Sequence, residues 1–459
     1  MIVMKIGGSS LRNVESLKKV VDLIIREDDP EKIVVLSAVN GVTNHLFKSV
    51  TEALETERKI ASLLDYLKML HNELAIAVIS SFAVRRKVLD EIDYLLSRLE
   101  KLLYGIAYTS ECTRRTRDLI VSMGERFAVQ LLAGCLEDRG QAAVPFDADR
   151  IDIVATGEFG YGNAELEMTA SLMPEHLKPL LGRGSIPIIT GFFGRTPDNH
   201  TITFGRGGTD YSAAIVAYAM NARELQVWKD VDGFMTADPG IVPEAKPLGY
   251  LAYEEAAELS YFGASILHPR TVEPLAKKRI PAVIKNTYKP ETPGTIIGVE
   301  KHLHDDVIKS VTFNRKIGAL RLHGASIGQQ VGFLKKVVTI LSNSDINIIS
   351  VITSQTAVNI LLAKEDIDRS RKLIETLSIP YVDHIEPIKD VALIGVVGEG
   401  LAETKGLAGR VFTAVANANT NVEMIVSGAS KVAQYFIIKE SDVEKTIQAI
   451  HSEFFSRKH

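Results

Sequence analysis

The sequence predicts an α/β protein in which a three-layer α/β/α domain with a helical insertion precedes two small βαββαβ modules of the ferredoxin-like kind. Two observations predict this class. Near the start, an apolar run, an amphipathic run and a β-branched run follow one another, as in a βαβ unit. Near the end, Gly332 and Gly406 open similar amphipathic segments 74 residues apart, and Asn347 and Asn421 repeat that offset. A constant offset between matching segments is typical of tandem copies of one structural unit.

The first domain is expected to begin with a strand at 2–6, a helix at 14–26 and a strand at 33–36. From residue 46 to residue 103 the chain has neither Gly nor Pro, and leucines recur at helical spacing. This predicts a helical insertion at about 46–118. Strands and helices then alternate again up to about residue 300, so residues 1–300 are assigned to one domain. Its later β-rich runs lie at 186–189, 201–204, 224–228 and 283–284.

Each C-terminal repeat is predicted to be a glycine-initiated amphipathic helix followed by a strand, with further β-rich segments around it. The first module is expected at 301–386 and the second at 387–459. The assignment of a strand near 307–313 is left open between the two modules.

Composition indicates a folded, soluble chain. Lys and Arg number 53 against 57 Asp and Glu, so the net charge is −4. The chain therefore lacks the excess of positive charge that is typical of nucleic-acid-binding proteins. Two cysteines are too few for a disulfide framework. No apolar run is expected to span a membrane, and the N-terminus enters a strand without the apolar region of a signal peptide. We therefore expect a cytoplasmic protein without nucleic acid or membrane partners.

Two glycine-rich turns indicate the chemistry that the protein performs. Residues 205–214 form a glycine cluster that runs through Asp210 into an Ala-rich segment, and such a turn brings backbone N–H groups close to an anion. It is not a Walker loop, because no Gly-Lys-Ser/Thr ending follows. The second turn, Gly7-Gly8, follows a strand that carries Lys5. Two anion-binding turns predict a phosphotransfer site, with Lys5 neutralising charge between the donor and an anionic acceptor. Asp210 is also predicted to cap a helix that begins at Tyr211.

Taken together, the motifs of the chain resemble those of the aspartate kinases, in which an amino-acid kinase domain precedes two ACT modules. The resemblance covers essentially the whole length and implies a monofunctional enzyme that transfers the γ-phosphoryl group of ATP to the side-chain carboxylate of L-aspartate, with Mg²⁺ required. The matching stretches are Lys5 to Ser10, Leu36 to Ala38 with Thr43-Asn44, Ser122 to Arg126, Gly205 to Ala214, Trp228 to Gly233, Glu255 to Leu259, Phe262 to Ala264 with Leu267 to Pro269, and Lys285 to Thr287.

The resemblance also implies roles for individual residues. Lys5 and Asp210 are the catalytic residues, and Asp210 orients the lysine. Arg206 binds the α-carboxylate of aspartate as a planar bidentate donor. No residue is assigned as a metal ligand. The remaining aspartate-binding residues are Ser37, Thr43, Glu125, Phe192 and Thr209, and the nucleotide-binding residues are Lys5, Gly7, Gly8, Ser9, Lys229, Asp230, Met235, Gly240 and Ser265.

The nucleotide half departs from the commonest family pattern. Ser265 and Gly240 stand where many aspartate kinases have Lys and Arg. Lys229 is therefore expected to supply the missing charge, with Lys285 as a second candidate. The lost cations leave open an inactive amino-acid sensor, and a different acceptor used by another amino-acid kinase is the other alternative. His268 and Trp228 are interpreted as packing residues.

Regulation is expected to reside in the two modules. In the family, ACT modules pair across subunits and bind an end-product amino acid, usually lysine or threonine, so at least a homodimer is expected. The segment 429–435 of the second module departs from the effector-binding pattern, which places the effector in the first module. The alternative is that the modules serve only as a dimer interface. The expected effector residues are Gln329, Asp345, Ile346, Asn347, Gln355 and Asn359.

Overall fold

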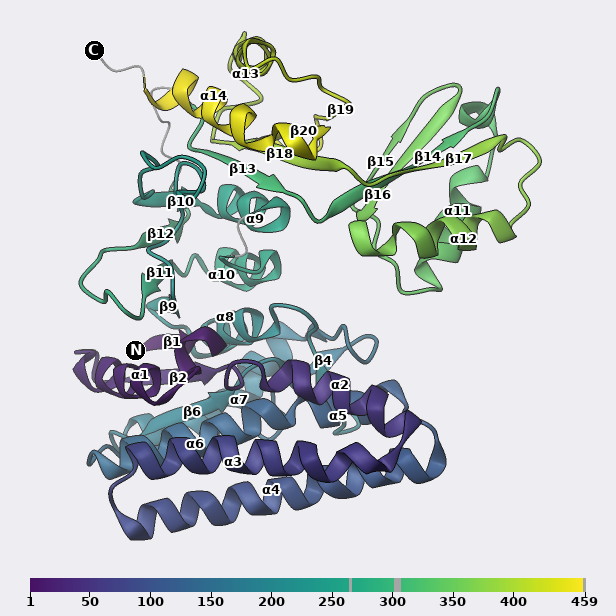
Figure 1. Cartoon of the computed structure of the whole chain (residues 1–459). Helices are drawn as coiled ribbons and strands as arrows, with labels where there is room; N and C mark the ends of the chain where they lie inside the picture. Colours follow the sequence, from purple (N-terminus) through teal and green to yellow (C-terminus); the bar gives the residue numbers. More distant parts are fainter. Residues whose placement is uncertain (264–265, 301–306, 457–459) are drawn as a thin grey trace. The chain divides into compact units, whose positions relative to one another are not determined.

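The computed structural model describes residues 1–263, 266–300 and 307–456. These residues form two compact units (Figure 1). The first contains 1–234, 247–257 and 266–300, and the second contains 235–246, 258–263 and 307–456. The predicted fold class is confirmed: an α/β domain with a helical insertion and two ferredoxin-like modules.

The first unit is built on an eight-stranded sheet with the order β10-β12-β11-β9-β1-β2-β6-β3. Its central pairs are parallel, and Lys5 of β1 lies opposite Val35 of β2 and Val227 of β9. Side chains of β1 alternate between the two faces. Ile2 and Met4 belong to the core shared with the helical insertion, so Lys5 projects from the other face. This alternation decides which face carries the lysine.

Helices cover both faces of the sheet, as predicted for three layers. Helix α6 packs on β2, β3 and β6, with α1 beside it, while α8 packs on β1, β2 and β9 and α7 on β6. In the insertion, α3 and α4 lie side by side and α4 packs along α6 (Figure 1). The leucines of α4 are buried against this core. The insertion therefore extends the hydrophobic core of one face of the sheet.

One helical stretch resembles a membrane-spanning segment, by length and composition only. Among the described residues, Arg114–Asp138 contains an 18-residue window that is apolar enough to cross a membrane. Its most apolar window is 89% buried, because α6 lies between the sheet and the insertion. It has the burial of a core helix in a folded domain.

The elements of the first unit follow from these patterns. Helix α1 has a full capping box, with Asn13 accepting from the N–H of Ser16. The strands are β1 (Ile2–Ile6), β2 (Lys32–Leu36), β3 (Ala143–Phe146), β4 (Ala155–Thr156), β5 (Asn163–Ala164), β6 (Ile186–Thr190), β7 (Phe193–Arg195), β8 (Thr201–Thr203), β9 (Glu224–Lys229), β10 (Tyr250–Ala252), β11 (Ala282–Asn286) and β12 (Thr295–Gly298); the helices are α1 (Val14–Arg26), α2 (Val42–Glu55), α3 (Ile60–Val78), α4 (Phe82–Thr109), α5 (Arg114–Val121), α6 (Met123–Asp138), α7 (Leu166–Leu181), α8 (Gly208–Met220) and α10 (Val272–Lys278), and α9 (Tyr253–Phe262) crosses into the second unit.

The second unit contains two four-stranded sheets, ordered β15-β16-β14-β17 and β13-β18-β20-β19. In each, two helices follow the βαββαβ order, except that the second module takes its last strand, β13, from ahead of the first module. Gly332 and Gly406 precede α11 and α13 with φ of 80° and 79°, a conformation that glycine adopts without strain. The bounds are β13 (Ser310–Asn314), β14 (Ile317–His323), α11 (Phe333–Ser342), β15 (Ser350–Thr353), β16 (Ala357–Ala363), α12 (Ile367–Thr376), β17 (His384–Ile388), β18 (Val391–Val397), α13 (Leu407–Asn417), β19 (Met424–Val426), β20 (Ala433–Lys439) and α14 (Val443–Phe455).

Segments from before residue 300 complete the second module. Ala237 and Val242 join its core, and the Thr236 hydroxyl lies 3.0 Å from Nε2 of His451. The Tyr435 hydroxyl donates to Glu258 at 2.7 Å. Segments 235–246 and 258–263 are therefore packed as parts of the second unit, which sequence spacing did not indicate.

A buried histidine makes the helical insertion sensitive to acid. His71 in α3 is fully buried, and burial lowers its pKa to about 4. The unfolded chain takes up this proton near pH 6.5, so the free energy of unfolding should fall as the pH drops from about 6.5 to about 4, by up to roughly 3 kcal/mol. Urea unfolding across this range should show a shallower slope for His71→Leu than for the parent. The exposed His45→Gln control should keep the parental slope, and an unchanged slope in His71→Leu would rule the effect out.

Candidate active site

The carboxyl ends of six parallel strands, β11, β9, β1, β2, β6 and β3, meet at one edge of the large sheet. There the chain after β1 turns at Gly7, whose N–H donates to the Trp228 carbonyl at 3.2 Å. The N–H of Gly191, after β6, donates to the Leu36 carbonyl at 2.8 Å, and that of Thr287, after β11, donates to the Lys229 carbonyl at 2.7 Å. Ligands of open α/β sheets bind outside this edge.

At this edge, two lysines flank one buried carboxylate. Lys5 Nζ lies 2.7 Å from Oδ1 of Asp210, and Lys229 Nζ lies 3.1 Å from Oδ2. Burial alone would raise the pKa of Asp210, but the charges of Lys229 and Lys5 hold it well below its usual range. Burial lowers the pKa of Lys5, and the Asp210 charge opposes that change. The cluster carries one net positive charge and can attract a phosphate.

The second glycine turn leads directly into α8. Gly205 and Gly207 have φ of 75° and 72°, and the ring of His268 lies where a Cβ on Gly207 would stand. Helix α8 begins at Gly208, so Asp210 lies in its first turn and is not the cap. The predicted helix start at Tyr211 was wrong, because the glycines adopt the turn and helical geometry themselves. The N–H groups of this turn and of the N-terminus of α8 can bind an anion.

Glu125 lies at the start of α6, beside the segment that follows β2. It is 2% exposed, and its Oε1 accepts the N–H of Ala38 at 3.1 Å. Its Oε2 has no hydrogen-bond partner within the described chain. Burial raises the pKa of Glu125 to about 8. An unpartnered carboxylate oxygen at this position can accept from an ammonium.

The other predicted aspartate-binding residues lie around the same edge. Phe192 adopts φ of 75°, unusual for a bulky residue, and its ring packs against Gly208. Thr209 lies against Gly191, while Arg206 is exposed on the glycine turn. Ser37 and Thr43 are half-buried after β2 and in α2.

The predicted nucleotide-binding residues are divided between the units. Gly8 allows close packing, because a Cβ there would stand 2.9 Å from the Ala38 carbonyl oxygen. Asp230 is exposed after β9. Met235 and Gly240 belong to the second unit, and Ser265 lies outside the described residues. Ser9 follows the first turn, half-buried.

Lys285 and Trp228 lie on adjacent strands of this sheet. The Nζ of Lys285 is 4.8 Å from the Trp228 ring centre, while the indole N–H donates to Gln226 at 3.0 Å. Lys285 therefore contacts an aromatic face, whereas Lys229 contacts Asp210 directly. The indole is buried, as expected for a packing residue.

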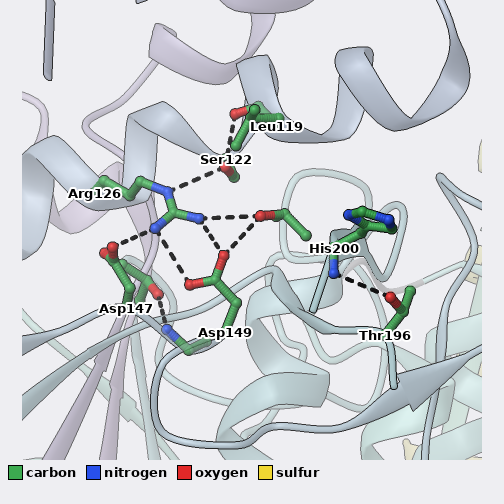
Figure 2. A network of polar contacts seen from close by, with 10 residues as sticks. Leu119, Ser122, Arg126, Asp147, Asp149, Thr196 and His200 are labelled. Atoms are coloured by element: carbon green, nitrogen blue, oxygen red, sulfur yellow. Dashed lines mark hydrogen bonds and ion pairs between the residues drawn. The ribbon is translucent and has the colours of Figure 1, made fainter. Parts of the chain in front are cut away.

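Two polar contacts near the site were not predicted. The Ser10 hydroxyl lies 2.8 Å from that of Thr287, which joins the first turn to the end of β11. Arg126 belongs to the matching stretch Ser122 to Arg126, but no role was predicted for it from the sequence. It bonds Asp147 and Asp149 from the start of α6, with Nη2 2.6 Å from Oδ2 of Asp149 (Figure 2). In the sequence, only the position of Arg126 next to Glu125 indicated that it could support the site.

The Arg126 network is buried and bidentate. Its Nε donates to the Ser122 hydroxyl, and its guanidinium lies 4.6 Å from the centre of the Phe193 ring. Burial raises the pKa of Asp147 against the opposing charge of Arg126. The network fixes the start of α6, which carries Glu125.

The expected effector residues lie in the first module. Ile346 is buried, whereas Gln329, Asp345, Asn347 and Gln355 are exposed. The Asn359 side chain accepts from Arg321 at 2.9 Å. The Gly328 N–H donates to the Gln355 carbonyl at 3.2 Å, which joins two of the predicted segments. Among residues the structure describes, no group of three or more His, Cys, Asp or Glu side chains could hold a metal ion.

Comparison with known proteins defines the class and then the family. The model of the amino acid kinase family matches residues 1–286, and an ACT domain model matches 394–454. Aspartokinase 1, chloroplastic, of Arabidopsis thaliana is 35% identical over 461 residues, covering 99% of this chain and 80% of its own. The chain therefore belongs to the aspartokinases.

Solved structures agree with this assignment. The structure of E. coli aspartokinase III in complex with aspartate and ADP has a TM-score of 0.83 and 28% identity, covering 99% of this chain and 100% of that one. The same enzyme in complex with lysine and aspartate also gives a TM-score of 0.83 at 28% identity, covering 99% of each chain.

Proposed function

We propose that this chain transfers the γ-phosphoryl group of ATP to the side-chain carboxylate of L-aspartate, the first step in making the aspartate-family amino acids. The bond between the γ-phosphorus and the bridging oxygen breaks, a carboxylate oxygen bonds to phosphorus, and ADP leaves with 4-phospho-L-aspartate. The acceptor is already ionised and needs no general base. The Lys5–Asp210–Lys229 cluster is the observation that carries this proposal, because it offers a preorganised positive charge where two anions must approach.

The proposed roles follow the geometry. Lys5 contacts the transferring phosphoryl group, Asp210 orients Lys5, and the Gly7-Gly8 turn, which lies beside the Lys5 ammonium, binds the donor phosphates. Arg206 binds the α-carboxylate of aspartate, and Glu125 binds its ammonium, whose charge favours ionisation of the glutamate. Ser37, Thr43, Phe192 and Thr209 complete the aspartate site; Ser9, Asp230, Met235, Gly240 and Ser265 complete the proposed nucleotide set.

Mg²⁺ is proposed to arrive with the nucleotide. Asp210, a buried carboxylate beside the glycine turns, is held by two lysines. Kinase Mg²⁺ keeps several waters and binds chiefly through substrate phosphates. The ion would neutralise charge on the phosphates, and the residues of this chain would position the acceptor.

An acceptor screen tests the proposal. The purified chain is incubated with ATP, Mg²⁺ and one carboxylic amino acid, and hydroxylamine traps the acyl phosphate as a coloured hydroxamate. Aspartate should give ATP-dependent hydroxamate; glutamate and N-acetylglutamate should not. No turnover with any acceptor would favour an inactive sensor, and turnover with another acceptor would favour a different amino-acid kinase.

The charge on Lys229 should matter for ATP. Lys229→Ala should raise the KM for ATP about tenfold, because it removes a charged contact near the phosphates, while the KM for aspartate stays nearly unchanged. Lys285→Ala is the matched control and should change the KM for ATP much less, because that lysine lies over Trp228. If the KM for ATP were unchanged in Lys229→Ala but raised in Lys285→Ala, Lys285 and not Lys229 would be the lysine that contacts the phosphates.

Regulation and assembly are proposed as follows. Lysine or threonine binds the first module near Gln329, Asp345 to Asn347, Gln355 and Asn359, and the chain assembles at least as a dimer through its ACT modules. The lysine complex of E. coli aspartokinase III supports an amino-acid effector. A cytoplasmic location fits the two free cysteines. Titrating activity with lysine and threonine, with sedimentation in parallel, tests this. A dimer insensitive to both would leave the modules a purely structural role.

A further inference from the structure

The side chains of Asp118 and Arg270 bind the same two backbone segments, 160–162 and 203–204. The second of these segments leads directly into the second glycine turn. Oδ2 of Asp118, in α5, accepts the N–H of Gly160 at 2.8 Å and that of Thr203 at 2.7 Å. Asp118 is 3% exposed, and burial raises its pKa against these two bonds. The two amides belong to segments far from α5 in sequence, and one of them lies two residues before Gly205.

Arg270 binds the same segments through their carbonyl groups. Its Nη1 donates to the Phe204 carbonyl at 3.0 Å, and its Nη2 donates to the Gly162 carbonyl at 2.6 Å. Its guanidinium also lies 4.3 Å from the centre of the Tyr211 ring in α8. Only a planar, forked donor can make these contacts together. Arg270 thus ties both segments to the helix that carries Asp210.

The two segments are also bonded to each other and carry the turn. The Gly162 N–H donates to the Thr203 carbonyl at 2.8 Å, and a Cβ on Gly205 would stand 3.0 Å from the Gly160 carbonyl oxygen. The exposed Arg206 follows at once. Asp118 and Arg270 therefore hold the backbone that leads into Arg206.

We propose that Asp118 and Arg270 are positioning residues for the aspartate site, acting through the backbone that carries Arg206. This inference depends on the proposed role of Arg206 in binding the α-carboxylate. A bidentate guanidinium–carboxylate pair tolerates little misplacement, so loosening this support weakens aspartate binding more than it slows phosphoryl transfer.

Steady-state kinetics of two variants tests the proposal. Asp118→Ala and Arg270→Lys should each raise the KM for aspartate about tenfold or more, while kcat and the KM for ATP stay within about threefold. Asp118→Asn keeps an acceptor oxygen and should restore much of the affinity. Hydrogen exchange of the amides at 160–163 and 203–207 should speed up in the two disruptive variants, and this readout remains if Asp118→Ala folds poorly.

The matched control is Asp152→Asn. It breaks an ion pair with Arg195, on the strand paired with β8 but at the end away from the glycine turn. It should leave the KM for aspartate unchanged. The positioning role would be overturned if Asp118→Ala and Arg270→Lys raised the KM for aspartate and the KM for ATP equally. It would also be overturned if both variants kept the kinetics of the parent. Absence of aspartate hydroxamate from the parent protein would instead refute the proposed function.

Discussion

Lys5→Ala and Asp210→Ala should each lower kcat by a factor on the order of a thousand at saturating ATP and aspartate. The Lys5 ammonium is buried and held 2.7 Å from the carboxylate of Asp210, so its charge is already in place before the phosphoryl group moves. Removing Asp210 leaves the buried Lys5 and the half-buried Lys229 without the anion between them. Both losses therefore act on the chemical step, and the double variant should be little worse than either single one.

The control for this prediction is another buried lysine in the same sheet. Lys32 lies on β2 opposite Ile2, at the other end of the strands, and its Nζ donates to the carbonyl groups of Ile24 and Glu27. Lys32→Met tests the cost of removing a buried ammonium away from the site, and its kcat should stay near that of the parent. Hydroxamate formation under saturating conditions gives the measurement. Near-normal kcat in Lys5→Ala would show that the first glycine turn has been assigned the wrong role.

Arg126→Met should lower the free energy of unfolding by about 3 kcal/mol, because it leaves two partly buried carboxylates without the buried guanidinium between them. Asp147 and Asp149 both bond the guanidinium, and the arginine side chain is only 3% exposed. The network joins the start of α6 to the loop after β3 (Figure 2). Urea unfolding at neutral pH measures the loss.

A surface arginine separates this effect from a general effect of removing charge. Arg139 bonds Asp22 at 2.9 Å, but both side chains are largely exposed. Arg139→Met should change the free energy of unfolding by no more than about 1 kcal/mol. Combining Arg126→Met with Asp147→Asn and Asp149→Asn should recover part of the stability, because no unpaired, partly buried carboxylate then remains. A loss in Arg126→Met no larger than that in Arg139→Met would contradict the buried-network account.

Local sequence pattern determined much of the fold of this protein. The βαβ start, the helical insertion with its glycine-free stretch at 46–103 and the 74-residue repeat depend on hydrophobic periodicity and turn residues, which act over short distances. The same holds for Lys5, because strand alternation and the following Gly7-Gly8 turn fix where it points. The prediction was wrong for the start of α8, because the glycines adopt the turn and helical geometry themselves.

Tertiary structure alone decided the contacts between distant segments. The convergence of Lys5 and Lys229 on Asp210 requires β9 to lie beside β1. The bonds of Asp118 to Gly160 and Thr203 join positions 42 and 85 residues away. Segment 235–246 joins the second module because its apolar residues bury against β13 and α14. Such pairings depend on chain topology and on the burial of polar groups, which no local pattern encodes. The sequence alone therefore determined the chemistry at the turns, and the folded chain decided which side chains hold those turns in place.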